Sequence, residues 1–297
     1  MATLLQQLLN GITLGSVYAL LALSITMIFG VLGVMAFAQG AVYMLSAYVG
    51  LFVVTQMHGY SILLTLPLAL VCAAAVGACV NVLIDQLTYR PLRNAGRLSS
   101  LISGIGVYFF IENAIGLLVG RKVFAFPAVL PAAQYQLGEI RVTAAQLTVL
   151  GTTAAAVAAL WYLVRRTEVG LIIRGVSERA ETAVLMSINP ERIILLTFAV
   201  AGALSGVAGV LIGAFIGVVA PSMGFLIGMK AFAAAVVAGI GNIPGALIGG
   251  LLVGIIETLS SGYISAAWSD AIVFLMLVLV LVIRPDGLIG AQAPQRA

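Results

Sequence analysis

Long apolar runs dominate this sequence and limit what the chain can fold into. The chain has 297 residues, of which 62% are hydrophobic and 8% are charged, whereas soluble domains carry about 25% charged residues. Apolar runs of about 18 or more residues recur, and a helix of that length crosses a hydrocarbon core of about 30 Å. The sequence therefore predicts one all-α polytopic membrane domain over residues 1–297.

Polar residues separate the apolar runs into about eight membrane segments. Spans are expected near residues 11–29, 34–55, 62–84, 98–119, 146–164, 191–213 and 267–283, with a broken or re-entrant Gly/Pro-rich segment near 224–259. No basic residue precedes the first run and no small-residue cleavage site is evident. We therefore expect the mature protein to begin at Met1.

Arginine is concentrated in two of the expected loops. One loop holds Arg90, Arg93 and Arg97, and the other holds Arg165, Arg166, Arg174, Arg179 and Arg192. The positive-inside rule assigns both loops to the cytoplasm. The loop 120–145 then lies outside, although it carries basic residues too, and the number of spans puts the N-terminus outside. Arg284 is also expected in the cytoplasm, so the region 224–259 must re-enter from one side or cross twice.

The region 224–259 contains "AGIGNIPGALIGG", in which Gly239, Asn242 and Pro244 interrupt an apolar run. Glycine weakens a helix and proline removes a backbone donor. Two short half-helices that line a pathway would satisfy this pattern, because irregular backbone at membrane depth must be buried in protein or face a water-filled cavity. A helical hairpin with its turn at the interface satisfies it equally well.

Glycines recur about four residues apart in two of the expected spans, which lets another helix backbone approach closely. The two sets are Gly202, Gly206, Gly209, Gly213 and Gly217, and Gly245, Gly249, Gly250 and Gly254. The pattern predicts packing seams, either within one bundle or between two subunits.

A few ionisable side chains lie within or near the ends of apolar runs. They are Glu112, which is followed by Asn113, together with Lys230 and Glu257. A charge at the bilayer centre costs about 2.5–3.5 kcal/mol on insertion scales. These groups are therefore expected to face the bundle interior, either as part of a pathway or gate or as structural ion pairs.

Several function classes find no support in the sequence. The net charge of +4 is not accompanied by a basic cluster interleaved with aromatic residues, which argues against nucleic-acid binding. His58 is the single histidine and no HExxH is present, while "GALSG" around Ser205 lacks a base on a span. Cys72 and Cys79 are expected to be small hydrophobes on one helix face. We expect no catalysis, metal site or cofactor on this chain, and without G-x-x-x-x-G-K-[ST] no nucleotide site either.

The most polar stretch is "RGVSERAETAVLMSINPERI" at residues 174–193, with six charges from Arg174 to Arg192. Asn189 can cap a helix that begins at Pro190, with Glu191 favourable at its positive end. Upstream, a short amphipathic helix is expected over about 176–187. Its apolar side would hold Ala180, Ala183, Val184 and Met186, and its polar side Glu178, Arg179, Glu181 and Thr182. Such a helix is either a solvated connection or a surface offered to a partner.

Part of this stretch resembles a known motif. Glu181, Ala183 and Ser187 are similar to the E-A-A-x-x-x-G cytoplasmic loop of ABC importer permeases. The segments "NGITLGSVYALLALSITMIFGVLGVMAFAQGAVYMLSAY" (10–48), "AVLMSINPERIILLTFAVAGALSGVAGVLIG" (183–213), "AFAAAVVAGIGNIPGALIGGLLVGIIE" (231–257) and "IRPDGLIG" (283–290) look like the LivH-type permease of branched-chain amino-acid ABC transporters. The resemblance covers essentially the whole chain.

This resemblance implies a multi-pass permease subunit in the bacterial inner membrane, surrounded by lipid and moving substrate by alternating access. Its implied partners are a second related permease, two cytoplasmic ATPase subunits that hold ATP and Mg, and a periplasmic substrate-binding protein. ATPase coupling is expected in the segment at about 165–190, through Glu178, Arg179, Glu181, Thr182, Ala183 and Ser187. The residues expected to line the pathway are Gln39, Tyr43, Glu112, Asn113, Gly239, Asn242 and Pro244.

The chain departs from the family pattern at two places. Family members commonly read N-F-A-H-G-E where this chain has "AFAQGA", so Ala36, Gln39 and Ala41 replace an amide, an imidazole and a carboxylate. This leaves branched-chain amino acids, other amino acids, urea, short amides and aromatic acids open as solutes. Ser187 replaces the loop glycine and is expected to change loop flexibility only.

Two rival functions remain open at this point. An ion-coupled secondary transporter would use Glu112 or Glu257 as a proton or sodium site, but it gives no reason for the charged segment 174–192. A structural membrane scaffold would carry no solute, which fits poorly with the broken helix.

Overall fold

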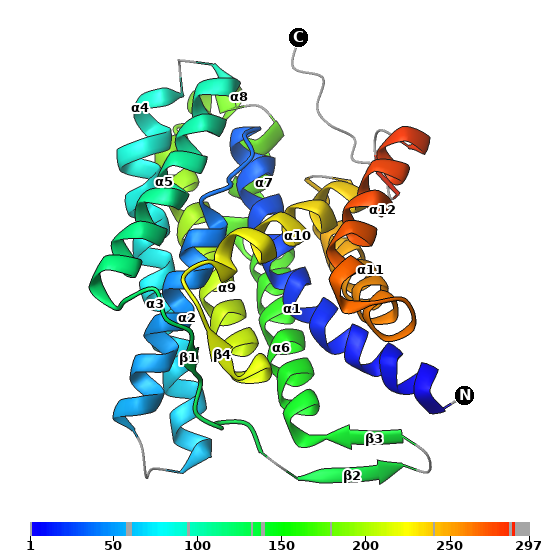
Figure 1. Cartoon of the computed structure of the whole chain (residues 1–297). Coiled ribbons are helices and arrows are strands. Elements are labelled where there is room, and N and C mark those ends of the chain that lie inside the picture. Colours follow the sequence, from blue (N-terminus) through cyan, green and yellow to red (C-terminus); the bar gives the residue numbers. More distant parts are fainter. Residues whose placement is uncertain are drawn as a thin grey trace.

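A computed structural model describes residues 2–57, 61–93, 96–131, 133–137, 140–178, 180–239, 241–284 and 287–288. The described chain is a bundle of helices with two small two-stranded ribbons (Figure 1). Among these residues, seven helical segments are long and apolar enough to cross a membrane, namely Thr3–Leu32, Leu64–Leu92, Leu98–Leu118, Ala144–Arg166, Pro190–Ile216, Ile243–Tyr263 and Ala266–Ile283. The predicted all-α polytopic class is confirmed.

The N-terminal half contains α1 (Ala2–Leu32), α2 (Gln39–Gln56), α3 (Ile62–Ile84), the π-helical turn η1 (Asp85–Tyr89), α4 (Arg90–Leu92), α5 (Arg97–Leu118) and β1 (Phe124–Ala125). The middle of the chain contains β2 (Gln134–Leu137), β3 (Ile140–Thr143), α6 (Ala144–Arg166), α7 (Glu168–Glu178) and α8 (Ala180–Leu185). The C-terminal part contains α9 (Pro190–Ile216), β4 (Val218–Val219), α10 (Met223–Ala238), α11 (Ile243–Tyr263), the 3-10 turn η2 (Ala266–Trp268) and α12 (Ser269–Ile283).

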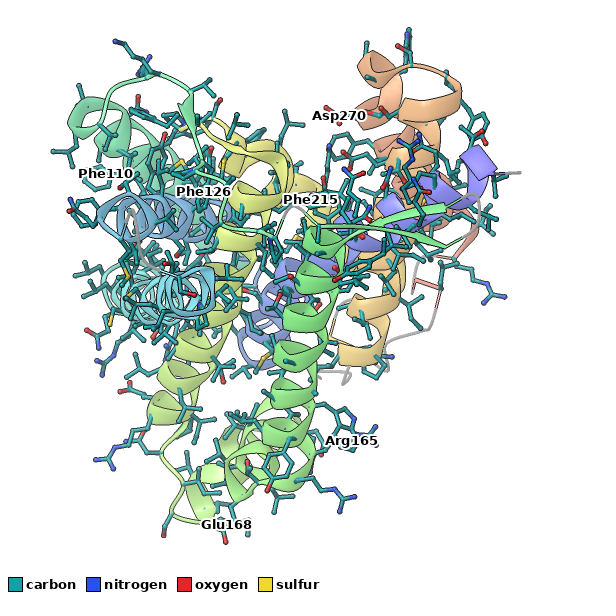
Figure 2. The ribbon with its side chains drawn as sticks, turned by 90° about the horizontal axis from the view of Figure 1, so that it is seen from below. Phe110, Phe126, Arg165, Glu168, Phe215 and Asp270 are labelled. Carbon is teal, nitrogen blue, oxygen red and sulfur yellow. The ribbon has the colours of Figure 1, made fainter. Side chains whose placement is uncertain are left out.

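The two arginine-rich loops lie at one end of the bundle. Figure 1 shows α4, α7 and α8 at the top, and Arg165 and Glu168 flank the junction of α6 with α7 (Figure 2). The N-terminus and the β2–β3 hairpin lie at the opposite end. There the Gln6 amide donates to the Arg141 carbonyl and accepts from the Arg141 N–H, both at 3.0 Å. The arginine loops are therefore separated from the loop 120–145, the arrangement that the charge pattern predicted.

The central helix, α1, is largely buried and packs antiparallel against α11. A Cβ atom placed on Gly250 would lie 2.4 Å from the Cα of Ala19, and one on Gly254 would lie 2.2 Å from the Cα of Gly15. A similar contact joins α9 to α3, where Gly202 faces the backbone of Gly77. The predicted glycine seams thus hold helices of this one chain together.

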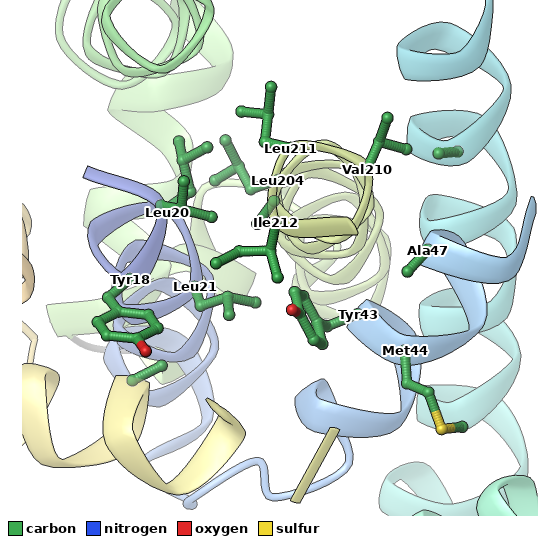
Figure 3. Close-up of a cluster of buried hydrophobic side chains, with 14 of the residues drawn as sticks. Tyr18, Leu20, Leu21, Tyr43, Met44, Ala47, Leu204, Val210, Leu211 and Ile212 are labelled. Carbon is green, nitrogen blue, oxygen red and sulfur yellow. The ribbon is translucent and has the colours of Figure 1, made fainter. Parts of the chain in front are cut away.

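Apolar side chains from α1, α2 and α9 fill the space beside these contacts (Figure 3). Tyr18, Leu20 and Leu21 of α1 lie in the same buried cluster as Tyr43 and Met44 of α2. The cluster also contains Leu204, Val210, Leu211 and Ile212 of α9. Burying these side chains fixes α1 and α9 at the centre of the bundle.

The interruption at 239–245 is a turn between two helices, as the hairpin alternative predicted. The backbone of Gly239 has φ of 103° where α10 ends, and the Asn242 side chain accepts from the Gly245 N–H at 3.4 Å where α11 begins. Pro244 lies in the first turn of α11. Proline has no backbone N–H, but the N–H groups of the first turn have no partner within the helix, so its absence costs no hydrogen bond there. The expectation of two half-helices meeting at 239–245 is wrong, because α11 is long enough to span by itself.

Irregular backbone occurs instead before α10. Gly217 ends α9 with φ of 80°, and the next residues form β4, which pairs antiparallel with β1. Phe126 N–H also donates to the Gly217 carbonyl at 2.8 Å. The short helix α10 has 16 residues and follows this extended segment. The discontinuity of the C-terminal region is therefore at 217–222.

The close contact between α1 and α11 can be tested with a pair of glycine substitutions. Gly250→Val places side-chain atoms against the Ala19 backbone and should lower the free energy of unfolding by about 1–3 kcal/mol or more, the usual cost of overpacking. Gly151→Val on α6 meets nothing within 4 Å and should change it by less than about 0.5 kcal/mol. Thermal unfolding of the purified chain in detergent, followed by circular dichroism, measures both. Equal stability of the two variants would contradict the packing role.

Candidate functional site

The charged segment after α6 folds back onto the end of the bundle. It forms α7 and α8, so its helical structure begins at Glu168, earlier than the predicted start near 176. Ile173 and Val176 of α7 and Ala183 of α8 are buried in a cluster that includes Phe198 of α9. The Arg174 side chain donates to the Val164 carbonyl at 2.7 Å, at the end of α6. The segment is therefore attached to α6 and α9 and is more than a solvated connection.

Three consecutive apolar side chains of this segment face outward. Val184 is 56% exposed, Leu185 is 84% exposed and Met186 is 76% exposed. We call these residues the exposed apolar triplet. The sequence pattern placed Val184 and Met186 on the same apolar side as Ala183, but Ala183 is buried whereas the other two are exposed. Met186 lies beyond α8, which ends at Leu185.

The other predicted coupling residues are only partly described. Glu178 is exposed at the end of α7. Arg179 lies outside the described residues, and so do the side chains of Glu181 and Thr182.

Ser187 closes α8 in a defined turn. Its φ is 60°, which makes it the one non-glycine residue of the described chain with positive φ. The Ile188 N–H donates to the Ala183 carbonyl at 3.1 Å and the Ser187 N–H donates to the Val184 carbonyl at 3.0 Å. These are the two hydrogen bonds of a Schellman motif, with Ser187 at the left-handed position that usually holds glycine. Serine restricts the backbone at this position more than glycine would, and the expectation that the departure changes only loop flexibility stays a prediction.

The helix α9 begins directly after this turn and as predicted. The Asn189 side chain accepts from the Glu191 N–H at 3.0 Å, and Pro190 is in the first turn. Glu191 also forms an ion pair with Arg90 of α4. Nearby, fully buried Asp85 of the π-helical turn binds Arg93 at 2.9 Å. Sequence reasoning missed both pairs. Asp85 lies at the polar end of a long apolar run, and this position could have indicated that its carboxylate needs a basic partner.

Gln39 lies in a buried polar network where four helices meet. The Oε1 atom of Gln39 accepts from Ser24 of α1 at 3.0 Å and from Ser205 of α9 at 2.8 Å, and the two serine hydroxyls are 2.9 Å apart. Its Nε2 atom donates to Asn81 of α3 at 2.9 Å, and Asn81 donates to the Phe198 carbonyl at 2.6 Å. These side chains are at most 1% exposed. In this conformation Gln39 ties α1, α2, α3 and α9 together and does not face an open pathway.

The remaining predicted pathway residues do not gather at one place. Tyr43 is fully buried in the apolar core (Figure 3), where its hydroxyl has no hydrogen-bond partner. Asn113 is exposed and accepts from Arg121 at 2.7 Å. Glu112 is half-buried on α5. The residues Gly239, Asn242 and Pro244 form the turn between α10 and α11.

Lys230 and Glu257 form a buried ion pair. The Lys230 ammonium lies 2.8 Å from Glu257 Oε1 on α11 and 2.6 Å from Asp270 Oδ1 on α12. The lysine side chain is 8% exposed and that of Glu257 is 14% exposed. Of the two roles expected for Lys230 and Glu257, part of a pathway or a structural ion pair, the structure shows the ion pair. A charge buried within an apolar bundle needs an opposite charge beside it. Sequence reasoning assigned no role to Asp270.

Within the described ranges, no group of three or more His, Cys, Asp or Glu residues is placed to hold a metal ion. Cys72 and Cys79 are free thiols on α3, half-buried and exposed respectively. His58 lies outside the described residues.

A family model described as "Branched-chain amino acid transport system / permease component" matches residues 7–281. The high-affinity branched-chain amino acid transport system permease protein LivH of Escherichia coli (strain K12) is 40% identical over 296 residues, which cover 96% of this chain and 95% of the relative. BraD, a permease protein of the same kind of system in Pseudomonas aeruginosa, is 38% identical over 293 residues with the same coverage. The ribose import permease protein RbsC of Haemophilus influenzae is 26% identical over 46% of this chain and 43% of its own length. No solved structure matches the chain.

The seven apolar helices and the permease relatives make this chain a multi-pass protein of the inner membrane. The family model covers most of the sequence, from the first turns of α1 to the end of α12, and the relatives match nearly end to end. The chain belongs to the family of branched-chain amino acid transport system permease components.

Proposed function

We propose that this permease is the membrane-spanning subunit of an ABC importer for branched-chain amino acids or a related small solute. A periplasmic binding protein delivers the solute, and two cytoplasmic ATPase subunits, which hold ATP and Mg, drive alternating access. A second related permease completes the pathway. The observation that carries the proposal is the exposed apolar triplet on a short segment that is itself anchored in the bundle.

The exposed apolar triplet supports docking because no described residue of this chain covers it. Val184, Leu185 and Met186 lie at the end of the bundle that holds the arginine loops, which the positive-inside rule assigns to the cytoplasm. Apolar side chains clustered at a membrane protein's aqueous end are expected to bind another protein. An ATPase subunit with an apolar groove, flanked by groups that pair with Glu178, fits this segment.

The connection from α8 to α9 supports transmission of a movement. The Schellman turn at Ser187 and the cap at Asn189 leave little slack between the two helices. Displacement of α8 therefore tilts α9, which also carries Glu191 against Arg90 and Ser205 against Gln39. A displacement of α8 is thereby transmitted through α9 and the Gln39 network to α1, α2 and α3.

The proposed solute follows from the relatives, whose names specify branched-chain amino acid transport. The departure at Gln39 supports no different solute, because its side chain serves helix packing in this conformation. The rival function of ion-coupled secondary transport loses one of its two carboxylates, since Glu257 is neutralised by Lys230.

Leu185→Glu tests the docking role. A charge on the exposed apolar triplet should weaken ATPase binding by about 2–3 kcal/mol, a typical hot-spot loss. The ATPase subunits should then no longer co-purify with the permease, and ATP-driven uptake into proteoliposomes should fall in parallel. Val123→Glu is the matched control, because Val123 is 65% exposed on the loop after α5. Full co-purification and uptake by Leu185→Glu would refute the docking role.

Ser187→Gly tests the turn between α8 and α9. Left-handed backbone costs a non-glycine residue about 1–2 kcal/mol, so glycine should raise the free energy of unfolding by about 0.5–1 kcal/mol after its own entropic cost. Ser187→Val, with a β-branched side chain, should lower it. In thermal unfolding of the purified permease, the glycine variant should have the highest unfolding temperature, the serine wild type the next and the valine variant the lowest. A valine variant as stable as the glycine variant would exclude this turn.

A further inference from the structure

The exposed side of α5 carries a polar group inside a membrane span. Exposed residues recur along this helix at the spacing that places them on one side, and we call them the α5 face: Leu98, Ile102, Gly106, Phe109, Phe110, Asn113 and Leu117. Phe110 lies at the edge of the bundle (Figure 2). Asn113 lies about 7–8 Å inside the end of α5 at Leu118. An amide is therefore exposed at membrane depth.

An arginine folds back onto the α5 face. The guanidinium of Arg121 donates to the Asn113 side-chain oxygen at 2.7 Å, and both residues are exposed. Gly116 makes room for it, since a Cβ atom there would lie 3.3 Å from the Arg121 Cγ. An arginine at the end of a lipid-facing helix extends outward to the membrane surface, whereas this one points back into the span. It forms no ion pair with any residue that the structure describes.

The exposed sides of two other spans have a different character. From Leu64 to Leu83, the exposed residues of α3 are Leu64, Pro67, Leu68, Val71, Ala75, Cys79 and Leu83. Those of α12 after Asp270 are Ala271, Leu275, Val278, Leu279, Leu281, Val282 and Ile283. These apolar side chains suit contact with lipid tails. Polar side chains inside a span face protein or a water-filled cavity instead, so something other than lipid covers the α5 face.

Irregular backbone lies beside the α5 face. The ring of Phe109 stacks on that of Phe225 in the first turn of α10, with the ring centroids 6.3 Å apart. Phe109 is about 18 Å along α5 from its start at Arg97, so α10 begins near the middle of the span. The non-helical segment before it ends at Ser222, which is exposed. Such backbone must be buried in protein or line a water-filled cavity, which also excludes lipid from this surface.

The position and charge of the α5 face limit what can cover it. A periplasmic binding protein and cytoplasmic ATPase subunits stay in the water on either side, so only another membrane-embedded chain reaches it. The exposed charges beside it, on Arg121 and Lys122, are both positive. The Glu112 carboxylate already interacts with the Tyr108 hydroxyl. Two copies of this face would therefore bring like charges together, which is unfavourable, whereas a different chain can supply a carboxylate.

We propose that the second, related permease packs on the α5 face and places a carboxylate against Arg121. A Cβ atom on Gly106 would meet nothing within 4 Å, so a helix of the partner can approach closely there, between the rings of Phe109 and Phe110 and the rest of the face. The Asn113 amide holds the guanidinium in position for the ion pair. This inference rests on the proposed function, which requires a second permease, and assigns that subunit a place.

A photo-cross-linking residue tests the location. In the complete transporter, purified and reconstituted in proteoliposomes, p-benzoyl-phenylalanine replaces Phe110, which is 75% exposed. Irradiation should join this chain to the second permease, and mass spectrometry of the adduct identifies the partner. The same residue in place of Val71 on α3 or Leu279 on α12, which are 66% and 52% exposed, is the matched control. These two probes should form no protein adduct, because they contact lipid.

Substitutions at Asn113 and Arg121 test the polar contact. Asn113→Leu and Arg121→Gln should each reduce the amount of second permease that co-purifies by about tenfold, the loss expected for one hydrogen bond to a charged group. Arg121→Lys keeps the charge and should lose less. On a lipid-facing surface, Asn113→Leu would instead leave assembly unchanged. Thermal unfolding of the isolated chain should be close to wild type for all three variants, which separates lost assembly from lost folding.

Several results would overturn this interface. One is a probe at Phe110 that captures no protein, or that captures a second copy of this chain. Another is capture of the second permease from Ala155 instead, since α6 also exposes the small residues Gly151, Ala155 and Ala159. Wild-type co-purification by Asn113→Leu and Arg121→Gln excludes the polar contact. The proposed function stands in all these cases if wild-type uptake requires ATP. Uptake by this chain alone would refute the proposed function and this inference together.

Discussion

Backbone-to-backbone contact at glycine is the constraint on which the rest of this structure depends. Lipid tails are as apolar as leucine, so helices in a membrane gain little from burying apolar side chains against each other. What remains is close packing and hydrogen bonding, and both require the helices to approach closely. Gly15 against Gly254 and Gly77 against Gly202 allow this approach between α1 and α11 and between α3 and α9. With bulkier residues at these positions, the polar groups beside the seams could not meet.

The buried network around Gln39 shows what the close approach makes possible. Three oxygen atoms, from Gln39, Ser24 and Ser205, lie within 3.0 Å of one another and share two hydroxyl protons. Water is absent from the apolar core of a bilayer, so an unpaired group there would cost several kcal/mol. The network therefore specifies one relative position of four helices. It also gives a movement of α9 a direct route to α1, α2 and α3.

Much of the fold was accessible from the sequence because membrane helices must satisfy their own backbone. Apolar run lengths predicted the spans, and Asn189 followed by Pro190 predicted the start of α9. Contacts between distant residues were not accessible, since the network partners Ser24 and Ser205 are 181 positions apart. The break was placed wrongly because glycine and proline at 239–245 gave a strong local signal. The true discontinuity at 217–222 depends on pairing of β4 with β1, and two-residue strands leave no periodic pattern.

The candidate site was less predictable than the fold for a related physical reason. Gln39, Glu112 and Glu257 were candidates because polar and charged side chains are rare in apolar spans. Gln39 is nevertheless hydrogen-bonded within the chain, and Glu257 is paired with Lys230. A group that is satisfied holds structure together, whereas a group left without a partner is free to bind a ligand. Glu112 takes part in no ion pair among the described residues, but its carboxylate interacts with the Tyr108 hydroxyl, so it too has a partner within the chain. A polar side chain within an apolar run therefore predicts a buried contact, because water is absent there, but the packing of the helices decides which residue provides the partner.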